Sequence, residues 1–326
     1  FTKVDLTGGQ EIEGAKMQIL DQDGKVVEEW VSKKEPHVVY ALEPGEYVLH
    51  EEQAPTEQGY VRAEDVKFVV EETGDVQKVK MEDDHTKVSI SKTDITDGKE
   101  IEGAKLQILN QDGEVVESWT TGEEHLIEYL PIGTYTLHEE AAVDGYIVAN
   151  DVEFTVEETG EIQKVKMEDE RAMGQLVIVK TDTDSKTALE GVEFVLLEKE
   201  TGEEVGRLKT GKDGKAVSEL LPIGTYENGV FKEPITYVLK ETATLKGYEK
   251  TEEEWEIVFT YQNDKTPVIE VVKEIQNKKI PETPGTVKPG PKTGDDTNWF
   301  LPLLALGVSA GMVAGLLYYR KRHKKA

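Results

Sequence analysis

Ionisable side chains end several short apolar runs of the sequence, at spacings that place them on the apolar side of a β-strand. Side chains two residues apart on a strand share a face. Lys92 therefore lies on the face of Val88 and Ile90, while Glu139 and Asp169 each end the apolar face of a later run. We expect one amine and two carboxyl groups to meet in one dry interior.

Such groups would change each other's protonation. Burial raises the pKa of an acid and lowers that of an amine, because it favours the neutral form of both. A neutral amine is a nucleophile, and a protonated carboxyl can polarise a neighbouring carbonyl. The set therefore has what a spontaneous amide bond between a lysine and an Asp or Asn requires. The alternative is that these residues lie at frayed strand ends and form ordinary ion pairs in water.

The set occurs three times because the chain is built of repeats. Residues 11–16 and 100–105 both read EIEGAK, so residues 1 to about 85 and about 86 to 170 are two copies of one unit. A third, diverged copy runs from about residue 174 to 279 and carries an insertion at 227–234. The lysines are Lys3, Lys92 and Lys180, the first carboxyls are Glu51, Glu139 and Glu241, and the second groups are Asp83, Asp169 and Asn277. This recurrence favours bond chemistry over chance ion pairs.

The alternating runs and turn residues in each copy are typical of β-strands. Short alternating runs such as residues 88–91 and 135–138 lie between Asp-Gly and Thr-Gly turns, and no long amphipathic helix competes. About seven short strands in roughly 100 residues are typical of an immunoglobulin-like sandwich. We predict an all-β protein of three tandem sandwiches, at residues 1–85, 86–172 and 173–279.

The C-terminal end has a different composition. Residues 280–298 are rich in proline and poor in apolar residues, which predicts an extended linker. Residues 299–319 form an uncharged apolar run, long enough to span a bilayer as one transmembrane helix. The basic tail at 320–326 would then lie in the cytoplasm.

Composition argues against several classes of function. The chain has 66 Asp and Glu residues against 38 Lys and Arg, a net charge of −28, which disfavours a nucleic-acid or anionic-membrane surface. No cysteine is present, so disulfides and thiolate chemistry are excluded. Residues 21–24 (DQDG) hint at a calcium loop, but Ile19 and Trp30 would occupy its first and last ligand positions. We expect no metal, no cofactor and no turnover enzyme.

The repeated pattern resembles a known family. Each copy has Lys-x-Asp near its start, Tyr-x-Leu-x-Glu further on and then Gly-Tyr, at 59–60, 145–146 and 247–248. This pattern resembles the SpaA or Cna-B type (prealbumin-like) domain of Gram-positive pilins and adhesins. The resemblance implies intramolecular isopeptide bonds with a glutamate as catalyst. Carried over, the bonds are Lys3–Asp83, Lys92–Asp169 and Lys180–Asn277, and the catalysts are Glu51, Glu139 and Glu241. An Asp acceptor implies loss of water, and an Asn acceptor loss of ammonia.

The order of features near the C-terminus resembles a sortase sorting signal. Pro291, Lys292, Thr293 and Gly294 precede the apolar run and the basic tail, with Gly290 where such signals usually have leucine. The resemblance implies cleavage after Thr293 and transfer to a peptidoglycan precursor or a pilin amine. Sortase is then the expected partner and the Gram-positive cell wall the expected location. A plain single-pass membrane anchor is the alternative.

Taken together, these features predict a stalk of stiff domains at a cell surface. The chain starts at Phe1 without a signal peptide, so we expect an unseen N-terminal part that binds a host ligand. Two alternatives are a pilin subunit, which would need a pilin-motif lysine, and a role of the repeats themselves as the ligand-binding adhesin. No nucleic-acid partner is expected.

Overall fold

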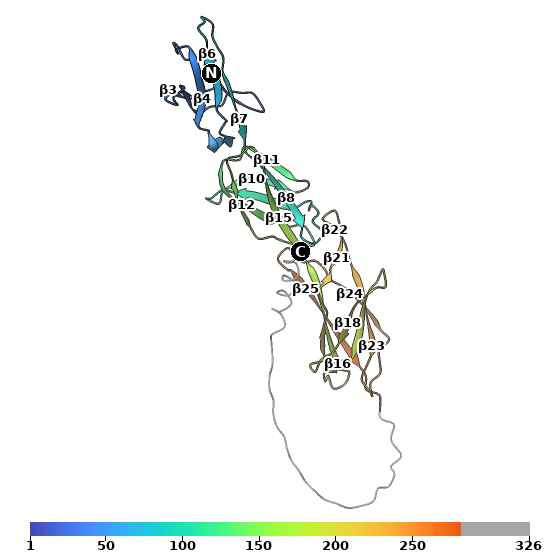
Figure 1. Ribbon diagram of the computed structural model, residues 1–326. Helices are drawn as coiled ribbons and strands as arrows, with labels where there is room; N and C mark the ends of the chain where they lie inside the picture. Colours follow the sequence, from blue (N-terminus) through green and yellow to red (C-terminus); the bar gives the residue numbers. More distant parts are fainter. Residues whose placement is uncertain (282–326) are drawn as a thin grey trace, which may run out of the picture. The chain divides into compact units, whose positions relative to one another are not determined.

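The computed structural model describes residues 1–281, and these residues form three β-sandwiches in sequence order (Figure 1). The all-β architecture with three tandem sandwiches agrees with the prediction from the sequence. Among residues 1–281, no helix has the length and apolar character needed to cross a bilayer. The predicted membrane helix, the basic tail and most of the predicted linker lie outside the described residues.

The first sandwich has one sheet of strand order β3-β2-β4-β6 and a second of order β1-β7-β5. Its strands are β1 (Thr2–Asp5), β2 (Lys16–Leu20), β3 (Val26–Val31), β4 (Gly45–Gln53), β5 (Tyr60–Val61), β6 (Val66–Val70) and β7 (Lys80–His85). A short 3-10 helix, η1 (Thr56–Gln58), precedes β5. The DQDG segment forms the turn between β2 and β3, where the Gly24 N–H donates to the Asp21 carbonyl (3.0 Å).

The second sandwich repeats this plan with longer first and last strands and one added edge strand, β11. Its sheets have the orders β10-β9-β12-β14 and β11-β8-β15-β13. The strands are β8 (Lys87–Asp94), β9 (Lys105–Leu109), β10 (Val115–Thr120), β11 (His125–Glu128), β12 (Gly133–Ala141), β13 (Tyr146–Ile147), β14 (Val152–Val156) and β15 (Ile162–Arg171).

The third sandwich keeps the plan and adds a hairpin. One sheet has the order β18-β17-β23-β24, and the other is built of β19, β16, β20 and β25. The strands are β16 (Met173–Asp182), β17 (Glu193–Glu198), β18 (Glu204–Lys209), β19 (Lys215–Val217), β20 (Leu221–Pro222), β23 (Thr236–Ala243), β24 (Glu254–Val258) and β25 (Val268–Asn277). The insertion noted in the sequence forms most of the hairpin of β21 (Gly224–Glu227) and β22 (Val230–Pro234).

Each sandwich places its first strand beside its last, and the two run parallel. These pairs are β1 with β7, β8 with β15, and β16 with β25. Parallel neighbours cannot be joined by a tight hairpin, so almost the whole domain lies between them along the chain. The two strands that open and close each domain are therefore in direct contact.

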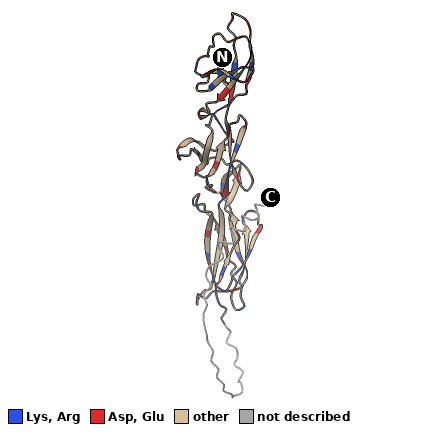
Figure 2. Ribbon diagram, turned by 60° about the vertical axis from the view of Figure 1, so that its left-hand side comes forward, with Lys and Arg blue, Asp and Glu red and all other residues tan. Residues whose placement is uncertain are grey.

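An apolar core fills the space between the two sheets of each sandwich. In the second sandwich, Val88 and Ile90 on β8 meet Leu106 and Ile108 on β9 and Leu137 on β12, and all five are buried. The alternation read from the sequence therefore points the apolar side chains inward, as β-strands of period two require. Charged residues lie along the strands of all three sandwiches (Figure 2).

The strands continue from one sandwich to the next with little chain between them. Only Thr86 separates β7 from β8, and only Ala172 separates β15 from β16. Both residues are buried, and the Thr86 hydroxyl donates to the Leu130 carbonyl (2.7 Å). Short ordered connections of this kind leave the backbone few free dihedral angles.

Candidate functional site

The second sandwich brings its three predicted site residues together in the core. Lys92 lies on β8, Asp169 on the neighbouring strand β15, and Glu139 on β12 of the facing sheet. The Lys92 amine donates a hydrogen bond to Asp169 Oδ1, and its Nζ lies 2.9 Å from Glu139 Oε2. All three are at least 98% buried. The site therefore bridges both sheets of the sandwich.

The other two sandwiches contain the same arrangement. In the first, the Lys3 amine donates to Asp83 Oδ1 and lies 2.9 Å from Glu51 Oε2. In the third, the Lys180 amine donates to Asn277 Oδ1 and lies 2.9 Å from Glu241 Oε2. These six residues are also buried. All nine site residues predicted from the sequence for the repeats thus lie in three matching clusters.

The strand register explains why each amine reaches its partner. Lys3 pairs with Met81, Lys92 with Met167 and Lys180 with Ile275. In each case the partner lies two residues before the Asp or Asn, so that group lies one step further along the same face. A lysine side chain is long enough to cross that step. The buried Met or Ile beside it keeps water out.

Burial dominates the electrostatics of the two aspartates. It raises the pKa of Asp83 to about 8 and that of Asp169 to about 7, although the neighbouring lysine lowers both values and the glutamate raises them. Burial likewise lowers the pKa of Lys180, and the interaction with Glu241 offsets only part of this effect. The protein interior thus shifts these groups toward their neutral forms, as expected when charge loses water.

Unpartnered oxygens mark where a proton belongs. Among the described residues, Glu51 Oε1 and Asp83 Oδ2 have no hydrogen-bond partner, and the same holds for Glu139 Oε1 and Asp169 Oδ2. The neighbouring Glu51 carboxyl also raises the pKa of Asp83, and Glu139 raises that of Asp169 in the same way. Each pair of neighbouring carboxyls therefore favours holding one proton, since two buried carboxylates that are both charged repel each other.

Backbone groups missed by the sequence analysis hold the glutamates. The Ala63 N–H donates to Glu51 Oε2 (2.7 Å), and the Ala149 N–H donates to Glu139 Oε2 (2.6 Å). Both alanines lie four positions after the glycine of the Gly-Tyr pair, but their backbone N–H groups leave no side-chain signal in the sequence. In the third sandwich Glu241 Oε1 instead accepts from the Asn277 amide (2.7 Å).

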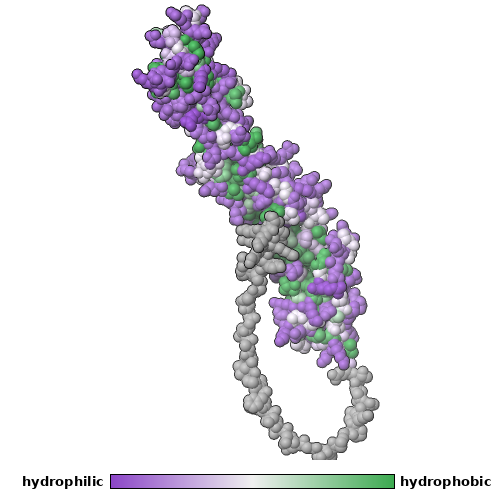
Figure 3. Space-filling model, viewed as in Figure 1, coloured by the Kyte–Doolittle hydropathy of each residue, from purple (hydrophilic) through white to green (hydrophobic). Residues whose placement is uncertain are grey.

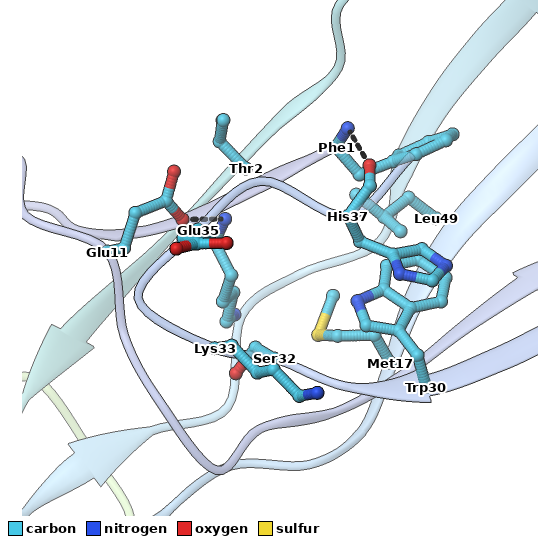
Figure 4. A pocket seen from close by; sticks show the side chains of 11 residues that line it. Phe1, Thr2, Glu11, Met17, Trp30, Ser32, Lys33, Glu35, His37 and Leu49 are labelled. Carbon is cyan, nitrogen blue, oxygen red and sulfur yellow. Dashed lines mark hydrogen bonds between the residues drawn. The ribbon is translucent and has the colours of Figure 1, made fainter. Parts of the chain in front are cut away.

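The EIEGAK segment positions the lysine strand. Glu100 accepts a hydrogen bond from the Lys92 backbone N–H (3.1 Å), and Glu11 does the same for Lys3 (3.1 Å). In the first sandwich the Phe1 amino group also donates to the His37 carbonyl (2.8 Å), beside a small pocket (Figure 4). These bonds fix the end of the strand from which the amine projects.

The Lys-x-Asp and Gly-Tyr motifs meet just beyond the site. In the second sandwich Asp94 Oδ2 accepts hydrogen bonds from the Tyr146 hydroxyl (2.7 Å) and from Arg171 Nε (2.6 Å). Asp94 is thus held by an ion pair with Arg171 and a hydrogen bond from Tyr146. Its contacts tie the ends of β8, β13 and β15 together.

No group of side chains suited to a metal ion occurs within residues 1–281. The predicted sorting residues Pro291, Lys292, Thr293 and Gly294 lie outside the described residues. The candidate site described by the structure therefore consists of the three Lys-Glu-Asp/Asn clusters. An amine beside a neutral acid or amide, with a second carboxyl in contact, is suited to forming an amide bond.

A family model agrees with the fold of the three sandwiches. The model of the SpaA prealbumin-like fold domain matches residues 1–85, 86–171 and 174–233, which together exceed half of the chain. The chain belongs to the SpaA family. The third SpaA domain extends beyond its matched range, because β23 and β25 carry Glu241 and Asn277.

Solved structures include several similar chains. The TIE protein of Bacillus anthracis is 27% identical with a TM-score of 0.53, and the match covers 85% of this chain and 50% of that one. BcpA, the major pilin subunit of Bacillus cereus, is 16% identical with a TM-score of 0.46, covering 85% and 98%. A streptococcal ancillary pilin is 20% identical with a TM-score of 0.29, covering 77% and 78%. This chain therefore spans about half the length of the TIE structure. No curated protein matches it.

Proposed function

We propose that each SpaA domain closes itself with an amide bond between its first and last strands, and that the closed domains form the stalk of a surface protein anchored by sortase. The bonds are Lys3–Asp83, Lys92–Asp169 and Lys180–Asn277. Glu51, Glu139 and Glu241 are their catalysts. The observation that carries the proposal is the same buried cluster, in the same strand register, in all three domains.

The chemistry follows from the contacts. The neutral lysine Nζ attacks Cγ of the Asp, whose carboxyl is protonated, and a new N–C bond forms. The amine gives one proton to the glutamate 2.9 Å away. The hydroxyl that leaves the Asp carboxyl takes one proton from this glutamate. The products are an amide and one water, and the glutamate ends in its starting form. An Asn acceptor releases ammonia in place of water. Each domain reacts once.

Intact-protein mass spectrometry of residues 1–281 tests this proposal. The mass should be lower than that of the sequence by two waters and one ammonia, because two acceptors are Asp and one is Asn. Digestion should then yield one branched peptide for each bond. A mass equal to that of the full sequence would show that the clusters are ion pairs only.

A cell-surface location is supported by the SpaA family, since domains of this type resemble those of Gram-positive pilins and adhesins. The anchoring step is supported by the sequence, in which PKTG at 291–294, an apolar run and a basic tail follow one another. Sortase and a wall or pilin amine are the partners this order requires. A host ligand would bind a region N-terminal to Phe1.

A ligand-binding role of the repeats has less support. The face of the molecule drawn in Figure 3 is largely hydrophilic with scattered apolar residues. Exposed apolar side chains such as Val115, Val116 and Ile162 occur on several strands. Scattered residues of this kind are normal on a soluble surface.

A further inference from the structure

The third site differs from the others in one residue that contacts the acceptor. The Asn277 amide nitrogen donates to Glu241 Oε1 and to the Thr244 hydroxyl oxygen, both at 2.7 Å. Thr244 lies three positions after Glu241, just beyond β23. The residues three positions after Glu51 and Glu139 are Ala54 and Ala142. A hydroxyl therefore occurs at this position only in the site whose acceptor is Asn.

An asparagine needs such a partner because its side-chain amide has an oxygen on one side and a nitrogen on the other. Both hydrogens of the Asn277 amide nitrogen are used, one by Glu241 and one by Thr244, and the carbonyl oxygen then faces the Lys180 amine. The opposite orientation would bring that oxygen against Glu241 Oε1 and the amide nitrogen against the amine. An aspartate has two equivalent oxygens before protonation, so it needs no residue to select an orientation.

We propose that Thr244 is a positioning residue for isopeptide formation at an Asn acceptor: it holds the leaving nitrogen of Asn277 against Glu241. This inference rests on the proposed bond between Lys180 and Asn277. The neutral Lys180 amine attacks Cγ and gives one proton to Glu241 Oε2, 2.9 Å away. Glu241 then gives this same proton to the amide nitrogen, which lies 2.7 Å from its Oε1. The C–N bond breaks, ammonia leaves, and the new amide joins the two strands.

The correct orientation matters for the rate. If the amide rotates, Glu241 faces an oxygen and has no leaving group to protonate, so the attack cannot be completed. The Thr244 hydroxyl contacts the amide nitrogen, which is neither the nucleophile nor the attacked carbon, so it acts by orienting Asn277. Removing one hydrogen bond to a reacting group is expected to slow the reaction about tenfold.

The test uses residues 1–281 recovered unfolded from inclusion bodies and refolded by dilution. Samples are quenched in acid and digested, and the branched peptide joining Lys180 and Asn277 is quantified over time. We expect T244A to form this peptide about tenfold more slowly, and T244S, which restores the hydroxyl, to recover the parent rate. The bonds in the first two domains serve as internal controls in every sample.

A second acceptor separates positioning from a general effect on folding. In an N277D background the acceptor resembles those of the first two domains, so adding T244A should not slow bond formation. The reciprocal change is A142T in a D169N chain, which should react faster than D169N alone. Equal slowing by T244A in the parent chain and in the N277D background would overturn the inference. So would an unchanged rate in T244A. Absence of the branched peptide in the parent chain would overturn the proposed bond itself.

Discussion

Moving a charged lysine and a charged carboxylate out of water costs free energy. Lys92, Glu139 and Asp169 are at least 98% buried, and the attraction within such a cluster offsets much of the desolvation penalty but rarely exceeds it. Forming an amide removes two ionisable groups and leaves a neutral one that needs only hydrogen bonds. Folding thus brings these side chains together in a state that the proposed reaction would relieve.

Glu139 and Glu140 provide a matched test of the catalyst. Glu139 is buried beside Lys92, whereas Glu140 is exposed on the opposite face of β12. We expect E139Q to block the second bond, so that the mass rises by one water beyond the substitution itself. Loss of the closed loop should lower the free energy of unfolding of that domain by about 4 to 5 kcal/mol.

E140Q should change neither the mass beyond the substitution nor the stability to urea. Mass spectrometry and equilibrium denaturation of both variants check this. If the two substitutions had equal effects, the assignment of strand faces would be wrong.

The pH dependence of bond formation should differ between domains. The reactive acceptor is the protonated acid, and the raised pKa values of about 8 for Asp83 and about 7 for Asp169 keep it populated at neutral pH. Raising the pH above these values ionises the acid, so the first two bonds should form more slowly at pH 9 than at pH 6. Asn277 has no proton to lose in this range, and its bond should not slow.

The measurement is refolding into buffers of different pH, followed by peptide analysis of each bond. Slowing of all three bonds together would point to a folding step, and no slowing would contradict the role of the neutral acid.

Sequence alternation was sufficient to find the side chains that meet in the three clusters but not the groups that hold them. Lys92 and Asp169 could be found because period two assigns each residue to a face. The Ala149 N–H and the Thr244 hydroxyl could not, because their contacts depend on how loops return to the site from the facing sheet. A backbone donor carries no side-chain signal.

At the scale of elements, the parallel pairing of first and last strands decides how a domain carries load. In the proposed closed domain, tension that enters at the start of β8 would reach Lys92, cross the bond to Asp169 and leave along β15 toward β16. The chain between the two bonded residues is bypassed. A closed domain therefore has little hidden length to release.

Single-molecule stretching of residues 1–281 tests this path. Lys92 and Asp169 are 77 positions apart in sequence. We expect the parent chain to show no unfolding step from the second domain, while E139Q should add one step of about 250 Å. E140Q is the control and should behave like the parent. An equally long step in the parent chain would show that the second domain is not closed.

The pairing direction itself was beyond the sequence analysis. Alternation at residues 88–91 and 162–169 predicts two strands but says nothing about which strands are neighbours, since the pairing is made across most of a domain. The insertion at 227–234 was found as a departure from the repeat. That it would form a hairpin with β21 was not predicted, although its Asn228-Gly229 pair, with positive φ at both residues, is the sequence signal of a two-residue hairpin turn.

At the scale of the whole molecule, the proposed anchor depends on a single peptide bond after Thr293. We expect T293A to remain in the membrane fraction of a Gram-positive host and to be extracted by detergent. The parent protein should be released only by wall hydrolases. Cell fractionation followed by immunoblotting checks both.

T286A is the matched control, since Thr286 lies in the same proline-rich segment but outside the PKTG motif. It should fractionate with the parent. Detergent-resistant T293A would show that another residue joins the protein to the wall.

The identity of the acceptor also determines what happens when a closed domain is opened again by water. Hydrolysis at Lys92 and Asp169 would restore the two side chains that the gene encodes, so the domain would return to its newly synthesised state and could close once more. Hydrolysis at Lys180 and Asn277 would leave an aspartate in place of the asparagine. An aspartate at position 277 would therefore show that the third domain had once been closed. Any second closure there would release water in place of ammonia.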